Sequence, residues 1–110
     1  MARVIFYLAI LITSTVFGQS NEKTQVKATV DTFFEGFHKG DTTLMKSVLA
    51  DKVVLQTAFK NKEGKDILRN DGDVSKLLNA IATRSNDQKW DERLLGYSIQ
   101  VDGNMANAWT

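Results

Sequence analysis

Residues 30–41 read VDTFFEGFHKGD, and the order of the first helices follows from this segment. It closes a helix predicted over residues 21–39, and Gly40 follows where glycine adopts a left-handed backbone without strain. Asp41 is positioned to cap a second, shorter helix that ends near Ala50. Five apolar residues at helical spacing give the first helix a single inward stripe: Val26, Val30, Phe33, Phe34 and Phe37.

Beyond the second helix the apolar pattern changes from helical to alternating. The side chains of residues 53–59 alternate between two faces, which predicts a strand. A polar turn then leads to a short returning strand at residues 65–68. An Asn-Asp-Gly-Asp break then precedes a third helix, for which Asp73 is the predicted N-cap. Its inward face is predicted to carry Val74, Leu77, Leu78 and Ile81.

The C-terminal part of the sequence predicts a hairpin. Residues 90–101 are predicted to form one long strand, and the Asp-Gly pair at 102–103 favours a tight turn to a partner strand that begins at Met105. Because the helices cluster in the N-terminal part of the sequence and the hairpin comes last, the order of elements indicates an α+β fold with helices on one face of an antiparallel sheet. Because the last strand would have an unpaired edge, we expect further strands after Thr110 or strands from a partner.

Composition limits the classes of partner. A chain of 110 residues has room for one domain, and its 43% hydrophobic and 25% charged content is that of a folded protein. Fourteen Lys and Arg against thirteen Asp and Glu leave a formal charge of +1, so we expect no nucleic-acid or anionic-lipid partner. Cysteine is absent, which excludes disulfides and Cys-ligated zinc.

Residues 1–18 are predicted to be a signal peptide. Arg3 supplies the positive start, an apolar run follows, and Val16 and Gly18 suit cleavage before Gln19. An uncleaved anchor is the alternative, but the apolar run has about fourteen residues where a membrane span needs about 20. The mature domain, residues 19–110, is therefore expected to be secreted or periplasmic and to leave the membrane after cleavage.

The stretch 30–41, together with the sequence LADKVV at residues 49–54, resembles the opening of the nuclear transport factor 2-like superfamily. Within it, residues 23–110 are most similar to the bacterial lumazine-binding and SnoaL-like branch. The resemblance implies a cone-like curved antiparallel sheet packed on three helices of the N-terminal half, with a pocket between helices and sheet. It also implies a C-terminally truncated domain whose last strands lie after Thr110.

The steroid-isomerase relatives in this superfamily carry a general-base Asp and an oxyanion-stabilising Tyr. Aligned through the Gly-Asp and Ala-Asp elements, these positions fall on Thr57 and Phe33. Threonine cannot accept a proton at a useful pKa, and phenylalanine cannot donate a hydrogen bond. The resemblance therefore implies no such isomerase chemistry, and we expect no catalytic residue and no cofactor.

Charged residues of the first helix have structural interpretations. His38, the single histidine, ends the helix, where its dipole favours a cation; the alternative is that His38 lines a pocket. Asp31 and Glu35 each have a lysine four residues away, Lys27 and Lys39, which indicates exposed ion pairs rather than an acid–base pair. No spacing of metal ligands accompanies His38, so no metal site is predicted.

Large aromatic side chains either fill the core or line an apolar cavity.

Three functions stay open: a module that binds a small apolar or aromatic ligand, a lyase- or isomerase-type enzyme whose catalytic residues follow Thr110, and an assembly module that dimerises through its sheet. We predict a binding or assembly module with no catalytic set of its own. The candidate pocket residues are Phe33, Phe37, Leu55, Thr57, Phe59 and Trp109.

Overall fold

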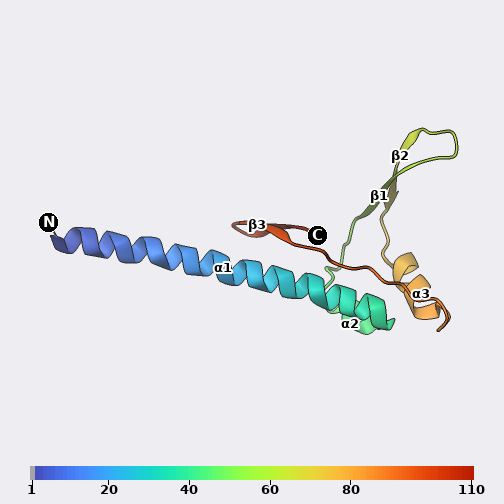
Figure 1. Cartoon of the computed structure of the whole chain (residues 1–110), viewed down its shortest axis with the longest axis horizontal. Coiled ribbons are helices and arrows are strands. Elements are labelled where there is room, and N and C mark those ends of the chain that lie inside the picture. The colour runs from blue at the N-terminus through green and yellow to red at the C-terminus, as the bar shows by residue number, and fades with distance from the viewer. Residues whose placement is uncertain (1) are drawn as a thin grey trace. The chain divides into compact units, whose positions relative to one another are not determined.

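The computed structural model describes the backbone of residues 2–110 and the side chains from residue 18 onward, except that of residue 19. The predicted signal peptide covers residues 1–18, and of these only residue 18 has a described side chain. The described chain is α+β, as predicted (Figure 1). Its elements are α1 (Ala2–Lys39), α2 (Thr42–Lys46), β1 (Leu55–Lys60), β2 (Asp66–Asp71), α3 (Ser75–Thr83), β3 (Ser98–Asp102) and β4 (Met105–Trp109).

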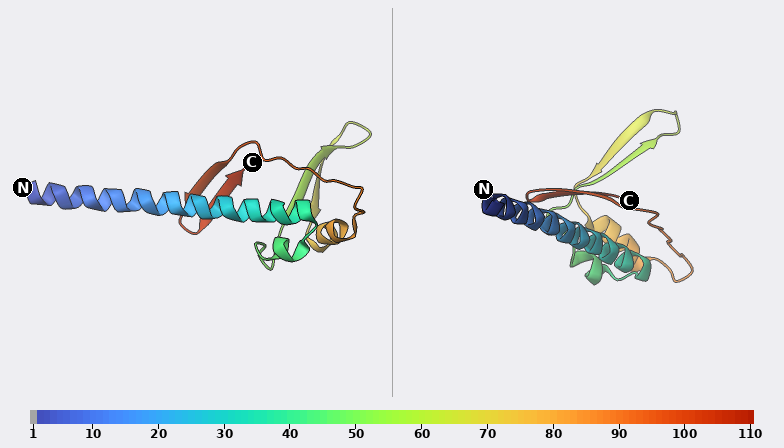
Figure 2. Two further views of the ribbon diagram at one scale, coloured as in Figure 1. Left: turned by 60° about the horizontal axis from the view of Figure 1, so that its bottom comes forward. Right: turned by 60° about the vertical axis from the view of Figure 1, so that its left-hand side comes forward.

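The strands pair as two antiparallel hairpins, β1 with β2 and β3 with β4 (Figure 2). Leu55 lies opposite Asp71 in the first hairpin, and Ser98 lies opposite Trp109 in the second. The described strands therefore form two small sheets and not one cone-like curved sheet. No helix in the described part of the chain combines the length and the apolar character that crossing a membrane requires.

The chain divides into two compact units. One comprises Met1–Asp31 and Arg93–Thr110, and so contains the first part of α1 and the hairpin β3–β4. The other, Thr32–Glu92, contains the end of α1, α2, the hairpin β1–β2 and α3.

The end of α1 has the predicted geometry. Gly40 has a φ of 71°, and its N–H donates to the carbonyl of Phe37 at 3.4 Å. The N–H of Asp41 donates to the carbonyl of Gly36 at 2.9 Å, which completes a Schellman motif. The carboxylate of Asp41 accepts the N–H of Leu44 at 3.0 Å and so caps α2.

Gly36 allows α2 to lie against α1. A Cβ at this position would come within 2.7 Å of Cγ of Met45 and 2.8 Å of the carbonyl oxygen of Asp41. Met45 is 0% exposed, although the apolar periodicity of the sequence does not single it out. The glycine is therefore needed for space, which is a different reason from the positive φ of Gly40.

A small apolar core lies in the unit Thr32–Glu92. Met45 from α2 packs with Leu78 and Ile81 from α3, which are 7% and 1% exposed. The predicted inward stripe of α3 is thus confirmed. The partly buried side chains packed against this core are Phe33, Phe37, Val74, Leu77 and Trp90.

The predicted strand over residues 90–101 is wrong for its first eight residues. Strand β3 begins only at Ser98, where its ladder with β4 begins, and residues 84–97 contain no strand. Two side-chain contacts explain this path. The ring centroid of Trp90 lies 5.5 Å from that of Phe37, and the N–H of Glu92 donates to Nε2 of His38 at 3.1 Å. Tertiary contacts therefore override strand propensity here.

Other element bounds also differ from the prediction: α1 begins at Ala2 instead of residue 21, and β1 is Leu55–Lys60 instead of residues 53–59. Helix α2 ends at Lys46 instead of near Ala50, because the next residues form tighter turns, such as Leu49 N–H to Lys46 carbonyl at 3.2 Å. Strand β2 extends to Asp71 because its pairing with β1 continues to Leu55.

Substitution of Gly36 by alanine tests the close approach of the two helices. Overpacking costs about 1–3 kcal/mol, and alanine regains up to about 1 kcal/mol of helix propensity. We expect a net loss of about 1–2 kcal/mol in the free energy of unfolding, measured by urea denaturation. Gly72→Ala is the control, because no atom lies within 4 Å of its added Cβ. A stabilised Gly36→Ala variant would contradict the packing.

Candidate functional site

Two of the predicted pocket residues lie together in one cleft. This hairpin cleft of about 520 Å³ is formed by β1, β2 and α3. Leu55 and Thr57 line it from β1, and Leu77 adds a second apolar side chain from α3. Gln56 also lines the cleft from β1. The other lining residues, which the sequence analysis did not propose, are Arg69, Asp71, Asp73 and Lys76.

The β-ladder register places four of the cleft residues on one face of the hairpin, whereas Gln56 lies on the other. Thr57 lies directly opposite Arg69, and Leu55 lies opposite Asp71. Directly opposite residues of an antiparallel pair share a face of the sheet. Phe59 lies on that same face, opposite Ile67, but it does not line the cleft.

The carboxylates of the hairpin cleft are already paired. Asp71 accepts Nε of Arg69 at 3.0 Å. Asp73 accepts the hydroxyl of Ser75 at 2.6 Å and its N–H at 2.8 Å, and these two bonds, the hydroxyl first, lower the pKa of Asp73. A carboxylate with a lowered pKa is a weak base, so this cleft is better suited to binding than to proton transfer.

The remaining predicted pocket residues lie elsewhere. Phe33 and Phe37 pack against the core, which agrees with their core interpretation. Phe59 is 43% exposed on β1, and Trp109 is 77% exposed on β4. Trp109 belongs to the other compact unit, and a ligand-binding role for all six residues stays a prediction.

A second cleft, of about 660 Å³, lies at the end of α1, and we call it the Arg84 cleft. Nη2 of Arg84 donates to the carbonyl of His38 at 2.6 Å, and its guanidinium carbon lies 5.4 Å from the ring centroid of Trp90. Nε2 of His38 accepts the N–H of Glu92 at 3.1 Å. His38 also lines the cleft, which was the alternative interpretation of this residue.

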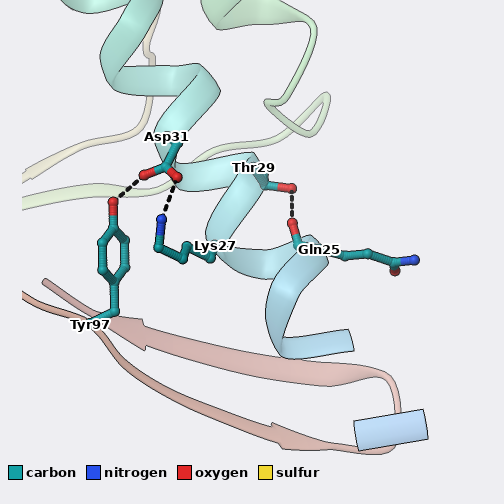
Figure 3. Close-up of polar contacts among 5 residues, drawn as sticks. All are labelled: Gln25, Lys27, Thr29, Asp31 and Tyr97. Atoms are coloured by element: carbon teal, nitrogen blue, oxygen red, sulfur yellow. Dashed lines mark hydrogen bonds and ion pairs between the residues drawn. The ribbon is translucent and has the colours of Figure 1, made fainter. Parts of the chain in front are cut away.

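A third polar cluster joins α1 to the residue before β3 (Figure 3). Nζ of Lys27 lies 2.8 Å from one carboxylate oxygen of Asp31 and 4.6 Å from the ring centroid of Tyr97. The hydroxyl of Tyr97 donates to the other oxygen of Asp31. The predicted i,i+4 pair is confirmed, as is the pair of Lys39 with Glu35 at 2.6 Å.

Asp31 and Tyr97 shift each other's pKa. Lys27 first and the Tyr97 hydroxyl second hold the pKa of Asp31 below its ordinary value. The hydrogen bond to Asp31 raises the pKa of Tyr97. Asp31 is thus an ionised acceptor at neutral pH, and the cluster has the character of a structural contact.

No group of three or more metal-ligating side chains comes together in the part of the chain that the structure describes. Comparisons of the chain with models of protein families, with curated proteins and with solved structures found no match. The functional assignment therefore depends on the chemistry of the two clefts.

Tyr97→Phe tests the contact between Tyr97 and Asp31. Because the pKa of Asp31 is lowered in the fold, its contribution to stability is present above about pH 4 and is lost as pH falls further. Without the hydroxyl, the pKa of Asp31 is expected to rise toward its ordinary value, measured by carboxyl-carbon NMR titration. Amide exchange in β3–β4 is expected to accelerate. Ser98→Ala, at the neighbouring position, serves as the control; an unchanged Asp31 titration in Tyr97→Phe would rule out the bond.

Proposed function

We propose that this chain is an exported module of the nuclear transport factor 2-like type that binds a small, largely apolar or aromatic ligand. It has no catalytic set of its own. The hairpin cleft carries the proposal, because it brings Leu55 and Thr57 together with Leu77 while its carboxylates hold partners.

The proposed ligand fits the mixed lining of the cleft. Cavities of about 300–1,000 Å³ accommodate small molecules, and a few placed polar groups fix their orientation. Leu55 and Leu77 offer apolar contact, and the Thr57 hydroxyl can donate or accept one hydrogen bond. Gln56 is already bonded to Asn70 at 2.6 Å, which makes Thr57 the better orienting group.

The proposal includes the family fold. Isolated two-stranded hairpins are marginal in water, and each gains stability from further strands or from a helix packed against it. We propose that the fold is the cone-like curved antiparallel sheet packed on helices that is typical of the nuclear transport factor 2-like type.

An assembly module is the second candidate, favoured by exposed apolar side chains. Met105 and Trp109 share one face of β3–β4 and are both 77% exposed. On the other hairpin, Leu68 is 59% exposed. Exposed apolar groups of this kind are typical of protein interfaces. In this function the chain forms a homodimer through its sheet.

A thermal-shift screen with a flavin, a pterin and a steroid tests ligand binding. A ligand at about 100 times its Kd adds about 2.7 kcal/mol to stability, so one of the three is expected to raise Tm by more than about 5 °C. Thr57→Val is expected to remove most of the rise, whereas Thr43→Val, outside the cleft, keeps it. No stabilisation by any ligand would refute the binding function.

Sedimentation tests the assembly candidate. If no ligand binds but the chain sediments as a dimer, assembly replaces ligand binding as the function. Trp109→Ser is then expected to weaken the dimer at least tenfold, because it removes a large apolar contact. A monomer at all concentrations would exclude the homodimer.

Export is tested by the N-terminus of the recovered protein. When the chain is produced in a bacterium with its leader, mass spectrometry of the periplasmic fraction is expected to show Gln19 as the first residue. Retention of Met1 on a membrane-bound product would instead support the uncleaved anchor.

A further inference from the structure

The guanidinium of Arg84 is fixed in place, yet one of its nitrogens lacks a partner. Nη2 donates to the His38 carbonyl, one of the carbonyls that a helix end leaves unpaired. The group also lies over the Trp90 ring. Nη1 is buried and has no hydrogen-bond acceptor among the described residues. Buried polar groups nearly always have a hydrogen-bond partner, so we expect an acceptor for Nη1.

Positive charge predominates among the side chains that line the Arg84 cleft. Lys39 is already paired with Glu35 at 2.6 Å. Arg84 and Lys89 add two further positive charges, and the negative charge of the lining, that of Asp91, has an interaction of its own. An anion would balance the excess of positive charge.

The same cleft has an apolar wall. Ile81 and Ala82 line it from α3, and Trp90 contributes its ring. A planar apolar group can pack against such a wall. The cleft shares no lining residue with the hairpin cleft, so it is a separate site.

We propose that the Arg84 cleft binds a small monocarboxylate with a planar apolar body. Its carboxylate accepts Nη1 of Arg84 after a side chain of the cleft wall turns aside, and Lys89 adds a second positive charge. Guanidinium groups bind carboxylate and phosphate alike, but the apolar wall favours a carboxylate on a planar apolar body over inorganic phosphate, which has no such body. The body of the ligand lies along Trp90.

Tryptophan fluorescence tests the site directly. The chain has two tryptophans, so Trp109→Phe leaves Trp90 as the single reporter. Benzoate is expected to change the Trp90 emission in a saturable way. Benzyl alcohol, which lacks the charge, and inorganic phosphate, which lacks the ring, are each expected to bind at least tenfold more weakly.

Matched variants locate the binding. Arg84→Met is expected to abolish the benzoate response, and Lys89→Gln to weaken it at least threefold. Lys89→Gln decides the test if Arg84→Met fails to fold, because Lys89 does not hold the His38 carbonyl. Lys76→Gln removes a lysine of the hairpin cleft and is expected to leave the benzoate response unchanged.

Three results would overturn the proposal: no saturable response to benzoate, equal binding of benzoate and benzyl alcohol, or equal effects of Lys89→Gln and Lys76→Gln. Thr57→Val separates this site from the proposed function. It is expected to leave benzoate binding unchanged while it removes stabilisation by the ligand of the hairpin cleft.

Discussion

Helix α2 approaches α1 so closely at Gly36 that one added methyl group would meet Met45 and the Asp41 carbonyl. The same glycine supplies the carbonyl that accepts the Asp41 N–H and closes the end of α1. It therefore provides both the space and the acceptor for the reversal of the chain. Met45 is buried as a result, and it gives Leu78 and Ile81 of α3 the surface against which they pack.

The end of α1 also directs the chain after α3. Arg84 bonds to the His38 carbonyl and Glu92 bonds to the His38 ring, so this helix end holds the segment at two points. Trp90 packs against Phe37 between them. These contacts take the backbone away from a strand ladder, and the same contacts create the walls of the Arg84 cleft. The failed strand prediction and the second cleft thus have one cause.

Local chemistry explains what the sequence could predict. Gly40, Asp41 and the inward stripe of α3 follow from rules that operate within a few residues. The contacts of Tyr97 with Asp31 and of Arg84 with His38 span 66 and 46 positions, and no local pattern signals them. For the same reason Leu55 and Thr57 could be proposed from alternation along one strand, whereas the cleft residues on β2 and α3 could not.

Charge pairing distinguishes the two clefts. In the hairpin cleft Arg69 is matched by Asp71, and Asp73 is satisfied by Ser75, so a charged ligand would have to compete with bonds already made. A neutral ligand gains there from apolar contact and one hydroxyl. In the Arg84 cleft a buried guanidinium nitrogen has no described acceptor, so a ligand gains most by supplying an anion. The pairing of charges, more than the similar volumes, is therefore what distinguishes the ligands that we propose for the two clefts.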